Sequence, residues 1–244
     1  MILLLLLSLL CLPAGAATVR MAFGDNLPPY ILVASKSGIE VDIVREALAW
    51  RGHVLQPVFM PMGRVPVSFL ARKADAIMID VGQDMAAAGG VYGDPPVIYH
   101  NYMYTLATRR LSIRTPSDLR KRWVMSFVGA SSRYPEWFGK LDRNEHYVER
   151  NNQESQPQLL AMGRYDVVVS DRTIFTYYAR QHERRDPHFR MPPVDEHARP
   201  KANPRDYRPV FRDARVRDDF NAGLAWLRKS GRYDAIYARY LNGE

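Results

Sequence analysis

Three acidic side chains are the residues of this chain best placed for polar chemistry. Asp171 directly follows the apolar run Val167–Ser170, and ligands of open α/β sheets usually bind at the carboxyl ends of strands. Its carboxylate either receives a cationic group or caps the helix that follows. Asp80 and Asp84 come shortly after a second apolar run, residues 76–79. These patterns favour a site that binds a polar or positively charged group.

A glycine–serine turn and a loop aromatic offer different contacts. Gly129 and Ser131 lie between a predicted strand and a predicted helix, where free backbone N–H groups favour an anion and the hydroxyl adds a donor. Ser131 alone would otherwise serve as an ordinary N-cap. Tyr30 follows Pro28-Pro29 in a loop, and we expect it to line a pocket, with packing on the surface as the alternative.

Motifs of enzymes and metal sites are absent from the sequence. The six histidines show no H-x-x-H or H-E-x-x-H spacing. There is no G-x-S-x-G, P-loop or dinucleotide-binding pattern. The single cysteine, Cys11, falls in the predicted leader, which excludes disulfides and cysteine nucleophiles from the mature chain. We therefore predict no catalytic residue, no metal and no cofactor.

Residues 1–16 have the pattern of a cleavable signal peptide. The apolar run Leu3–Leu12 is too short to span a bilayer, and Ala14-x-Ala16 supplies the small residues that a signal peptidase needs. We place cleavage after Ala16. Leu10 stands before Cys11 where a lipid-attachment signal requires a small residue, so we expect a soluble periplasmic protein.

The chain is strongly basic, with a formal charge of +8 and arginines concentrated in Arg180–Arg190 and Arg199–Arg217. In an intracellular protein such stretches would favour nucleic acid as a partner. Export argues against that partner, and interleaved acidic residues are typical of a solvated face. We predict a monomer that does not bind nucleic acid.

Alternating strands and helices predict two successive α/β units. Strand–helix alternation indicates parallel sheets covered by helices. The second unit begins near the capping sequence Thr115-Pro116-Ser117-Asp118. The predicted strands are 18–23, 54–60, 76–79, 97–108, 123–128, 146–149, 166–170 and 207–211, and the predicted helices are 41–51, 65–72, 131–141, 156–162, 173–181, 216–229 and 233–241.

A series of short motifs follows the same order along the mature chain. They are Pro28-Pro29-Tyr30, Gly38-Ile39-Glu40-Val41-Asp42, Leu70–Ala76, Gly93-Asp94-Pro95, Ser117-Asp118-Leu119, Gly163–Val168, Phe220–Leu224, Leu227-Arg228, Gly231–Asp234 and Ile236-Tyr237. Together, behind a signal peptide, they resemble the type II periplasmic substrate-binding proteins of amino-acid-type ABC transporters, known as bacterial extracellular solute-binding protein family 3.

The resemblance implies an α/β, two-lobed periplasmic-binding-protein-like II fold with two crossover strands as its hinge. Residues 17–105 and 195–244 would form lobe 1, and residues 106–194 would form lobe 2. Closure about such a hinge traps a ligand. In the family, an aromatic at the position of Tyr30 stacks on the ligand, and an acid at that of Asp171 takes its ammonium group. The predicted ligand-binding residues are Asp25, Tyr30, Arg64, Asp80, Gly82, Gly129, Ser131 and Asp171.

One departure from the family bears on the ligand. Family members that bind α-amino acids carry Thr-x-x-Arg after the third strand, and the arginine clamps the carboxylate. The corresponding stretch here, Asp80–Ala88, lacks an arginine and contains Asp80 and Asp84. Arg64 either replaces the clamp or is a surface arginine at a helix start. We expect a cationic or uncharged polar solute to bind better than acidic or neutral α-amino acids.

The function predicted on this basis is capture of a small polar molecule, amino-acid-like or amine-like, for an ABC permease. A sensory binding module that reports to a membrane partner is the first alternative. A small periplasmic enzyme similar to cyclohexadienyl dehydratase is the second. That enzyme requires a carboxylate acting as acid or base in the cleft, for which Asp80 is the candidate.

Overall fold

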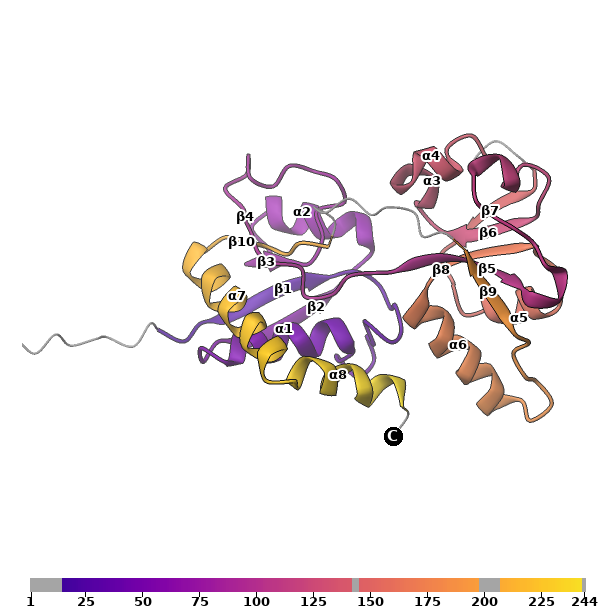
Figure 1. The fold of residues 1–244 in the computed structure, drawn as a ribbon. Coiled ribbons are helices and arrows are strands. Elements are labelled where there is room, and N and C mark those ends of the chain that lie inside the picture. Colours follow the sequence, from indigo (N-terminus) through magenta and orange to yellow (C-terminus); the bar gives the residue numbers. More distant parts are fainter. Residues whose placement is uncertain (1–14, 142–144, 198–206, 243–244) are drawn as a thin grey trace, which may run out of the picture.

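A computed structural model describes residues 15–141, 145–197 and 207–242 of the chain. The structure consists of two α/β lobes, each built on a five-stranded sheet (Figure 1). The strand orders are β2-β1-β3-β10-β4 in the first sheet and β7-β6-β8-β5-β9 in the second. The predicted two-lobed fold class is therefore confirmed.

The first sheet is parallel at its centre and antiparallel at one edge. β1 pairs in parallel with β2 and β3, while β10 runs antiparallel between β3 and β4. Met21, Ala22 and Phe23 are fully buried, because helices cover both faces of the sheet. The strands are β1 (Thr18–Phe23), β2 (Val54–Phe59), β3 (Ala76–Ile77), β4 (Val91–Tyr92) and β10 (Val210–Phe211). The short strand β4 is not among the predicted strands.

Helices from both ends of the chain cover this sheet. α7 lies so close to α1 that a Cβ atom at Gly223 would lie 2.0 Å from the carbonyl oxygen of Ala47. Only glycine allows this approach, which places the C-terminal segment on the first lobe. The helices are α1 (Ile39–Ala49), the 3-10 turn η1 (Met62–Arg64), α2 (Val65–Leu70), α7 (Ala214–Lys229) and α8 (Arg232–Leu241).

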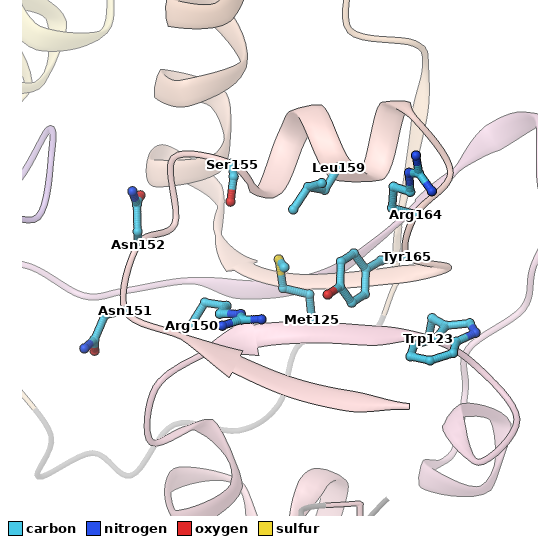
Figure 2. Close-up of a pocket in the computed structure, with 9 residues that line it drawn as sticks. All are labelled: Trp123, Met125, Arg150, Asn151, Asn152, Ser155, Leu159, Arg164 and Tyr165. Carbon is cyan, nitrogen blue, oxygen red and sulfur yellow. The ribbon is translucent and has the colours of Figure 1, made fainter. Parts of the chain in front are cut away.

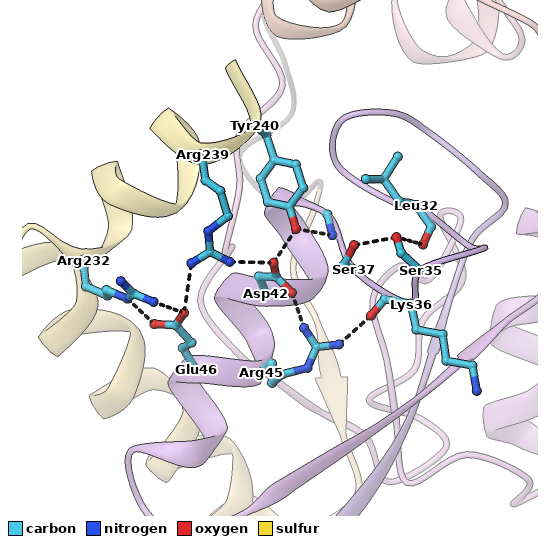
Figure 3. Close-up of polar contacts among 11 residues, drawn as sticks. Leu32, Ser35, Lys36, Ser37, Asp42, Arg45, Glu46, Arg232, Arg239 and Tyr240 are labelled. Atoms are coloured by element: carbon cyan, nitrogen blue, oxygen red, sulfur yellow. Dashed lines mark hydrogen bonds and ion pairs between the residues drawn. The ribbon is translucent and has the colours of Figure 1, made fainter. Parts of the chain in front are cut away.

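Ion pairs and hydrogen bonds fasten α8 to α1 (Figure 3). Asp42 accepts hydrogen bonds from Tyr240 Oη and from Arg239, the latter at 3.3 Å. The carboxylate of Glu46 accepts two hydrogen bonds from Arg232, one from Nε at 2.7 Å and one from Nη2 at 2.8 Å. Because Asp42 is only 6 % exposed, salt screens this contact less than it screens an ordinary surface ion pair. The network holds the C-terminal helix against the helix that follows the Tyr30 loop.

The second sheet has the same mixed character. β6 pairs in parallel with β7 and β8, and β5 runs antiparallel to both β8 and β9. β8 is buried along its whole length, as its near-continuous apolar sequence requires. The strands are β5 (Asn101–Leu106), β6 (Val124–Phe127), β7 (Tyr147–Arg150), β8 (Val167–Asp171) and β9 (Val194–His197).

Two separate apolar clusters cover the faces of the second sheet. The prediction of one helix over residues 131–141 is wrong. The chain forms α3 and α4, separated at Tyr134, whose φ of −127° is not helical. Pro135 restricts the residue before it and has no N–H to donate, so the first helix ends there. The helical elements are η2 (Ala107–Arg109), η3 (Pro116–Leu119), α3 (Ala130–Arg133), α4 (Pro135–Phe138), α5 (Gln156–Ala161) and α6 (Arg172–Arg185).

Two strands near the lobe junction pair with each other in the second sheet. The chain passes from the first lobe into the second at β5 (Figure 1), and β9 is the antiparallel neighbour of this strand. The predicted lobe boundaries, after residues 105 and 194, fall within these two strands. Both strands belong to the second sheet over their full length. Residues 198–206, through which the chain returns to β10, lie outside the described residues.

Most of the predicted signal peptide, residues 1–14, lies outside the described residues. Within the part of the chain that the structure describes, every helix is too short or too polar to cross a bilayer.

Candidate functional site

The carboxyl edge of the second sheet faces the first lobe. β6 and β8 run in parallel, so their carboxyl ends lie on the same edge. Gly129 follows β6 two residues after its end, and Asp171 is the last residue of β8. Tyr30 of the first lobe donates a hydrogen bond from Oη to Asp171 Oδ1 at 3.2 Å. Ile174, one turn into α6, belongs to the apolar cluster of the first lobe. The two lobes thus meet at the end of β8.

Asp171 is the most heavily bonded side chain at this edge. Its Oδ1 accepts the backbone N–H groups of Thr173 at 2.9 Å and Ile174 at 3.1 Å, which caps α6. Its Oδ2 accepts the N–H of His100 at 2.6 Å. Burial raises the pKa of Asp171 to about 6, although these hydrogen bonds oppose the shift. The helix-capping alternative therefore describes this structure, and the ammonium contact stays a prediction.

Tyr30 lies beneath other rings and is 1 % exposed. Its ring centroid is 4.5 Å from that of Tyr99, and the ring of Tyr237 meets it edge-on at 6.4 Å. The backbone at Gly38 packs directly against the backbone of Tyr30. Only glycine fits there, because a Cβ atom would lie 2.3 Å from the Tyr30 carbonyl oxygen and because the φ of Gly38 is +123°. Both ring contacts come from the protein itself, and stacking on a ligand stays a prediction.

A row of aromatic side chains, which the sequence does not reveal, continues from Tyr30 across the lobes. The Tyr99 and Tyr207 rings are 4.8 Å apart, and the guanidinium of Arg133 lies 4.8 Å from the centre of the Tyr207 ring. Tyr99 precedes β5, Tyr207 precedes β10 and Arg133 ends α3. No local periodicity links three such distant segments, so only the fold could bring them together. Burial raises the pKa of Tyr99 well above its ordinary value.

Glu149 occupies the position where the sequence predicts an anion. Its Oε2 accepts the N–H of Gly129 at 2.6 Å, and its Oε1 accepts the N–H of Ser131 at 2.7 Å. Tyr147 adds a hydroxyl donor at 2.8 Å. Burial alone would raise the pKa of Glu149, but these hydrogen bonds outweigh it and lower the pKa. The turn binds a carboxylate as its chemistry predicts, and that carboxylate is the protein's own.

Asp80 and Gly82 meet in a turn of the first lobe. Asp80 Oδ1 accepts the N–H of Gly82 at 2.9 Å, and Oδ2 accepts the hydroxyl of Tyr92 at 2.8 Å. Asp84 accepts the N–H of Ala86 at 2.9 Å. These carboxylates therefore hold the loop in shape, while Asp80 stays partly exposed.

Arg64 and Asp25 stand apart from the other predicted site residues. Both are exposed, and Arg64 is the last residue of η1. Within the described part of the chain, the guanidinium of Arg64 has no hydrogen bond or ion pair. Its role as a clamp stays a prediction.

Glu40 is a further buried carboxyl group near this junction. It is 4 % exposed, in the first turn of α1, and burial raises its pKa to about 8. Its charge also contributes to the raised pKa of Tyr99. The sequence places Glu40 within a motif but does not reveal that it is buried.

Among the described residues, no group of three or more His, Cys, Asp or Glu side chains is arranged to hold a metal ion.

Solved structures with this fold share little sequence identity with the chain. A histidine kinase sensor domain similar to periplasmic binding proteins is 22 % identical, with a TM-score of 0.64, over 92 % of this chain and 96 % of that one. An ancestral arginine-binding protein bound to arginine is 19 % identical, with a TM-score of 0.62, over 91 % of this chain and 97 % of that one. The GluR0 ligand-binding core with L-glutamate is 18 % identical, with a TM-score of 0.67, over 93 % of this chain and 99 % of that one.

No family model matches the sequence, and no curated protein matches it at a significant level. The likeness to solved structures nevertheless extends over nearly the whole chain, both lobes included. The chain thus has the two-lobed, type II periplasmic-binding-protein fold.

Proposed function

We propose that this protein binds a small polar molecule, amino-acid-like or amine-like, between its lobes and delivers it to an ABC permease. The observation that carries the proposal is the hydrogen bond between Tyr30 and Asp171. It joins a loop of the first lobe to the strand end of the second where ligands of α/β sheets bind. A solute that inserts at this junction would change how the lobes meet, which a permease can recognise.

The charges at the junction favour a cationic or uncharged solute. Asp171 and Glu40 are buried there, and the Gly129–Ser131 turn already holds the carboxylate of Glu149. A carboxylate ligand would have to displace Glu149 or lie unpaired near buried acids, which costs several kcal/mol. A cation would instead interact favourably with the carboxylate of Asp171, and it would favour the ionised form of Glu40, whose pKa burial raises to about 8.

A sensory role is the second candidate. The supporting observation is the likeness to a histidine kinase sensor domain over 92 % of the chain. Both roles use the same closing junction and differ only in the membrane partner. Co-purification with a permease supports transport, and co-purification with a membrane kinase supports sensing. An enzymatic role for Asp80 is less well supported, because both its oxygens accept hydrogen bonds within the loop.

A thermal-shift screen of the mature protein tests the proposal. Amino acids, amines and small organic acids are added singly, and a true ligand raises the melting temperature by mass action. We expect arginine or a diamine to give the largest shift and glutamate the smallest. If every compound leaves the melting temperature unchanged, while the protein is folded by circular dichroism, the proposed binding function is wrong.

Calorimetric titration of variants then identifies the polarity of the site. Glutamate, arginine and a diamine are titrated into wild type, Asp80→Asn and Arg64→Ala. Tight glutamate binding that is lost in Arg64→Ala and unchanged in Asp80→Asn would show that Arg64 is the clamp and that the predicted polarity is reversed. Lys73→Ala serves as a control, since Lys73 is an exposed cation of the same lobe.

We propose that the mature protein is an exported monomer that begins at Ala17. In the structure, the backbone nitrogen of Ala17 donates to Nδ1 of buried His53 at 3.1 Å, which would anchor this end. Intact mass of the periplasmic fraction checks the cleavage site, and a lipid-modified Cys11 would contradict it.

A further inference from the structure

A cavity on the second lobe lies over the face of the sheet that α5 covers (Figure 2). Its volume is about 650 Å³, which is within the range of roughly 300–1,000 Å³ typical of small-molecule sites. It opens between β6, the end of β7 and α5. The lining residues are Trp123, Met125, Arg150, Asn151, Asn152, Ser155, Leu159, Arg164 and Tyr165.

The inner surface of this cavity is apolar. Met125, Leu159 and Tyr165 belong to or pack against one apolar cluster. Trp123 is 48 % exposed at one end, where its ring stacks on that of His146 at 4.4 Å. An exposed tryptophan beside a tyrosine is a surface on which a flat or hydrocarbon group can bury area.

Two guanidinium groups make the cavity positive. Arg150 extends across the floor toward Met125 and Tyr165, and Arg164 stands at the rim above Tyr165 (Figure 2). Neither guanidinium has a hydrogen bond or ion pair with any other residue that the structure describes. Asn151, Asn152 and Ser155 add uncharged donors along the opposite side.

The carboxylates adjacent in sequence to the lining residues are already engaged. Glu149 accepts three hydrogen bonds at the Gly129–Ser131 turn, and successive residues of a strand point to opposite faces, so Arg150 projects away from it. Glu154 pairs with Arg185, and Asp166 pairs with Arg109. The positive charge of the cavity is therefore not neutralised by its neighbours.

We propose that this cavity binds a small organic anion with an apolar body, a carboxylate or a phosphate monoester. The forked guanidinium of Arg150 matches two oxygens of either group, and Arg164 adds a second positive charge. The apolar body would lie over Met125 and against Trp123. This site is separate from the residues at the Tyr30–Asp171 junction, and the inference does not rest on the proposed function.

Titration of the full mature protein with 2-naphthoate and 2-naphthyl phosphate tests the inference. Binding is followed by the indole N–H resonance of Trp123, assigned with Trp123→Phe. We expect at least one anion to shift this resonance and to bind at least about tenfold more tightly than neutral 2-naphthalenemethanol. The carboxylate and phosphate arms show which headgroup is preferred. Equal affinity for the neutral alcohol, or an unshifted Trp123 resonance with both anions, would overturn the proposal.

Variants decide whether the two arginines are responsible. Arg150→Gln and Arg164→Gln should each weaken anion binding at least about fivefold, and Arg150→Lys should lie between wild type and Arg150→Gln because it keeps the charge but not the fork. Arg190→Gln is the matched control, since Arg190 is an exposed arginine of the same lobe outside the cavity. An equal loss in Arg190→Gln would show a general charge effect and overturn the proposal. Urea unfolding of each variant verifies that the fold is retained.

Discussion

The carboxyl edge of the second sheet contains two carboxylates in contrasting situations. Asp171 follows the β8 core and Glu149 lies near the end of β7, and each accepts backbone N–H groups at a strand-to-helix turn. Asp171 is 2 % exposed and its pKa is raised to about 6, whereas Glu149 is only partly buried and its pKa is lowered. Similar hydrogen bonds therefore accompany opposite shifts.

Burial decides the sign of the shift. Loss of hydration destabilises the charged form, and hydrogen bonds to the carboxylate stabilise it. At Asp171 the first effect exceeds the second, and at Glu149 the order is reversed. A folded-state pKa above the ordinary value means that the contribution of Asp171 to stability falls as the pH rises from about 4 to about 6. The contribution of Glu149 is present above its ordinary pKa and is lost as the pH falls through the lowered value.

The largest expected effect is that of Asp171→Ala. The change removes the buried cap of α6 and the carboxylate that accepts the His100 N–H. We expect a loss of about 3–5 kcal/mol in the free energy of unfolding, measured by urea denaturation. Asp213→Ala, which removes the more exposed cap of α7, is the matched control and should cost about 1 kcal/mol. Equal losses in the two variants would show that burial of Asp171 adds nothing.

Glu40→Gln extends the comparison to a buried carboxyl group whose pKa is shifted by burial alone. Burial raises the pKa of Glu40 to about 8, so wild type loses stability as the pH rises from about 4.5 to 8. The variant has no charge to bury, and we expect it to be about 2–4 kcal/mol more stable than wild type at pH 8 and equal to it near pH 4.

Urea unfolding at several pH values measures this difference. Glu136→Gln, at an exposed residue of α4, should leave the pH dependence unchanged. A constant difference between wild type and Glu40→Gln at all pH values would contradict the raised pKa.

The sequence predicts the elements well and the contacts of site residues less well. Strand Thr18–Phe23 agrees with its prediction because its alternation is local, and α5 and α7 differ only at their ends. The break at Tyr134 was missed because a proline in a helical pattern is compatible with a helix start.

The protein side chains that contact the predicted site residues could not be derived from the sequence. Glu149 fills the Gly129–Ser131 turn because β7 lies beside β6, and this pairing is set by tertiary structure. The contact between Tyr30 and Asp171 spans 141 residues, so no local pattern encodes it. The sequence predicts a turn whose N–H groups favour an anion, and the fold determines that the carboxylate of Glu149 lies there.

Glu149→Ala should have a moderate effect. Gly129 and Ser131 lose their acceptor, but water can reach this partly buried turn, so we expect a loss of about 1–2 kcal/mol at pH 7. The loss should decrease as the pH falls below about 4.5, because wild type then loses the same contribution. Urea unfolding at pH 7 and at pH 3.5 measures both values. A loss that is independent of pH would contradict the lowered pKa of Glu149.

Tyr30→Phe should have the smallest effect and bears directly on the junction between the lobes. The variant keeps the ring packed on Tyr99 and removes only the hydroxyl, whose bond to Asp171 is long at 3.2 Å. We expect a loss of about 1 kcal/mol. A double-mutant cycle with Asp171→Asn measures the pairwise contribution. Because the bond joins two lobes, the coupling energy should appear in the unfolding of the whole molecule. A coupling energy indistinguishable from zero would show that the lobes are held at this point by ring packing and not by the hydrogen bond.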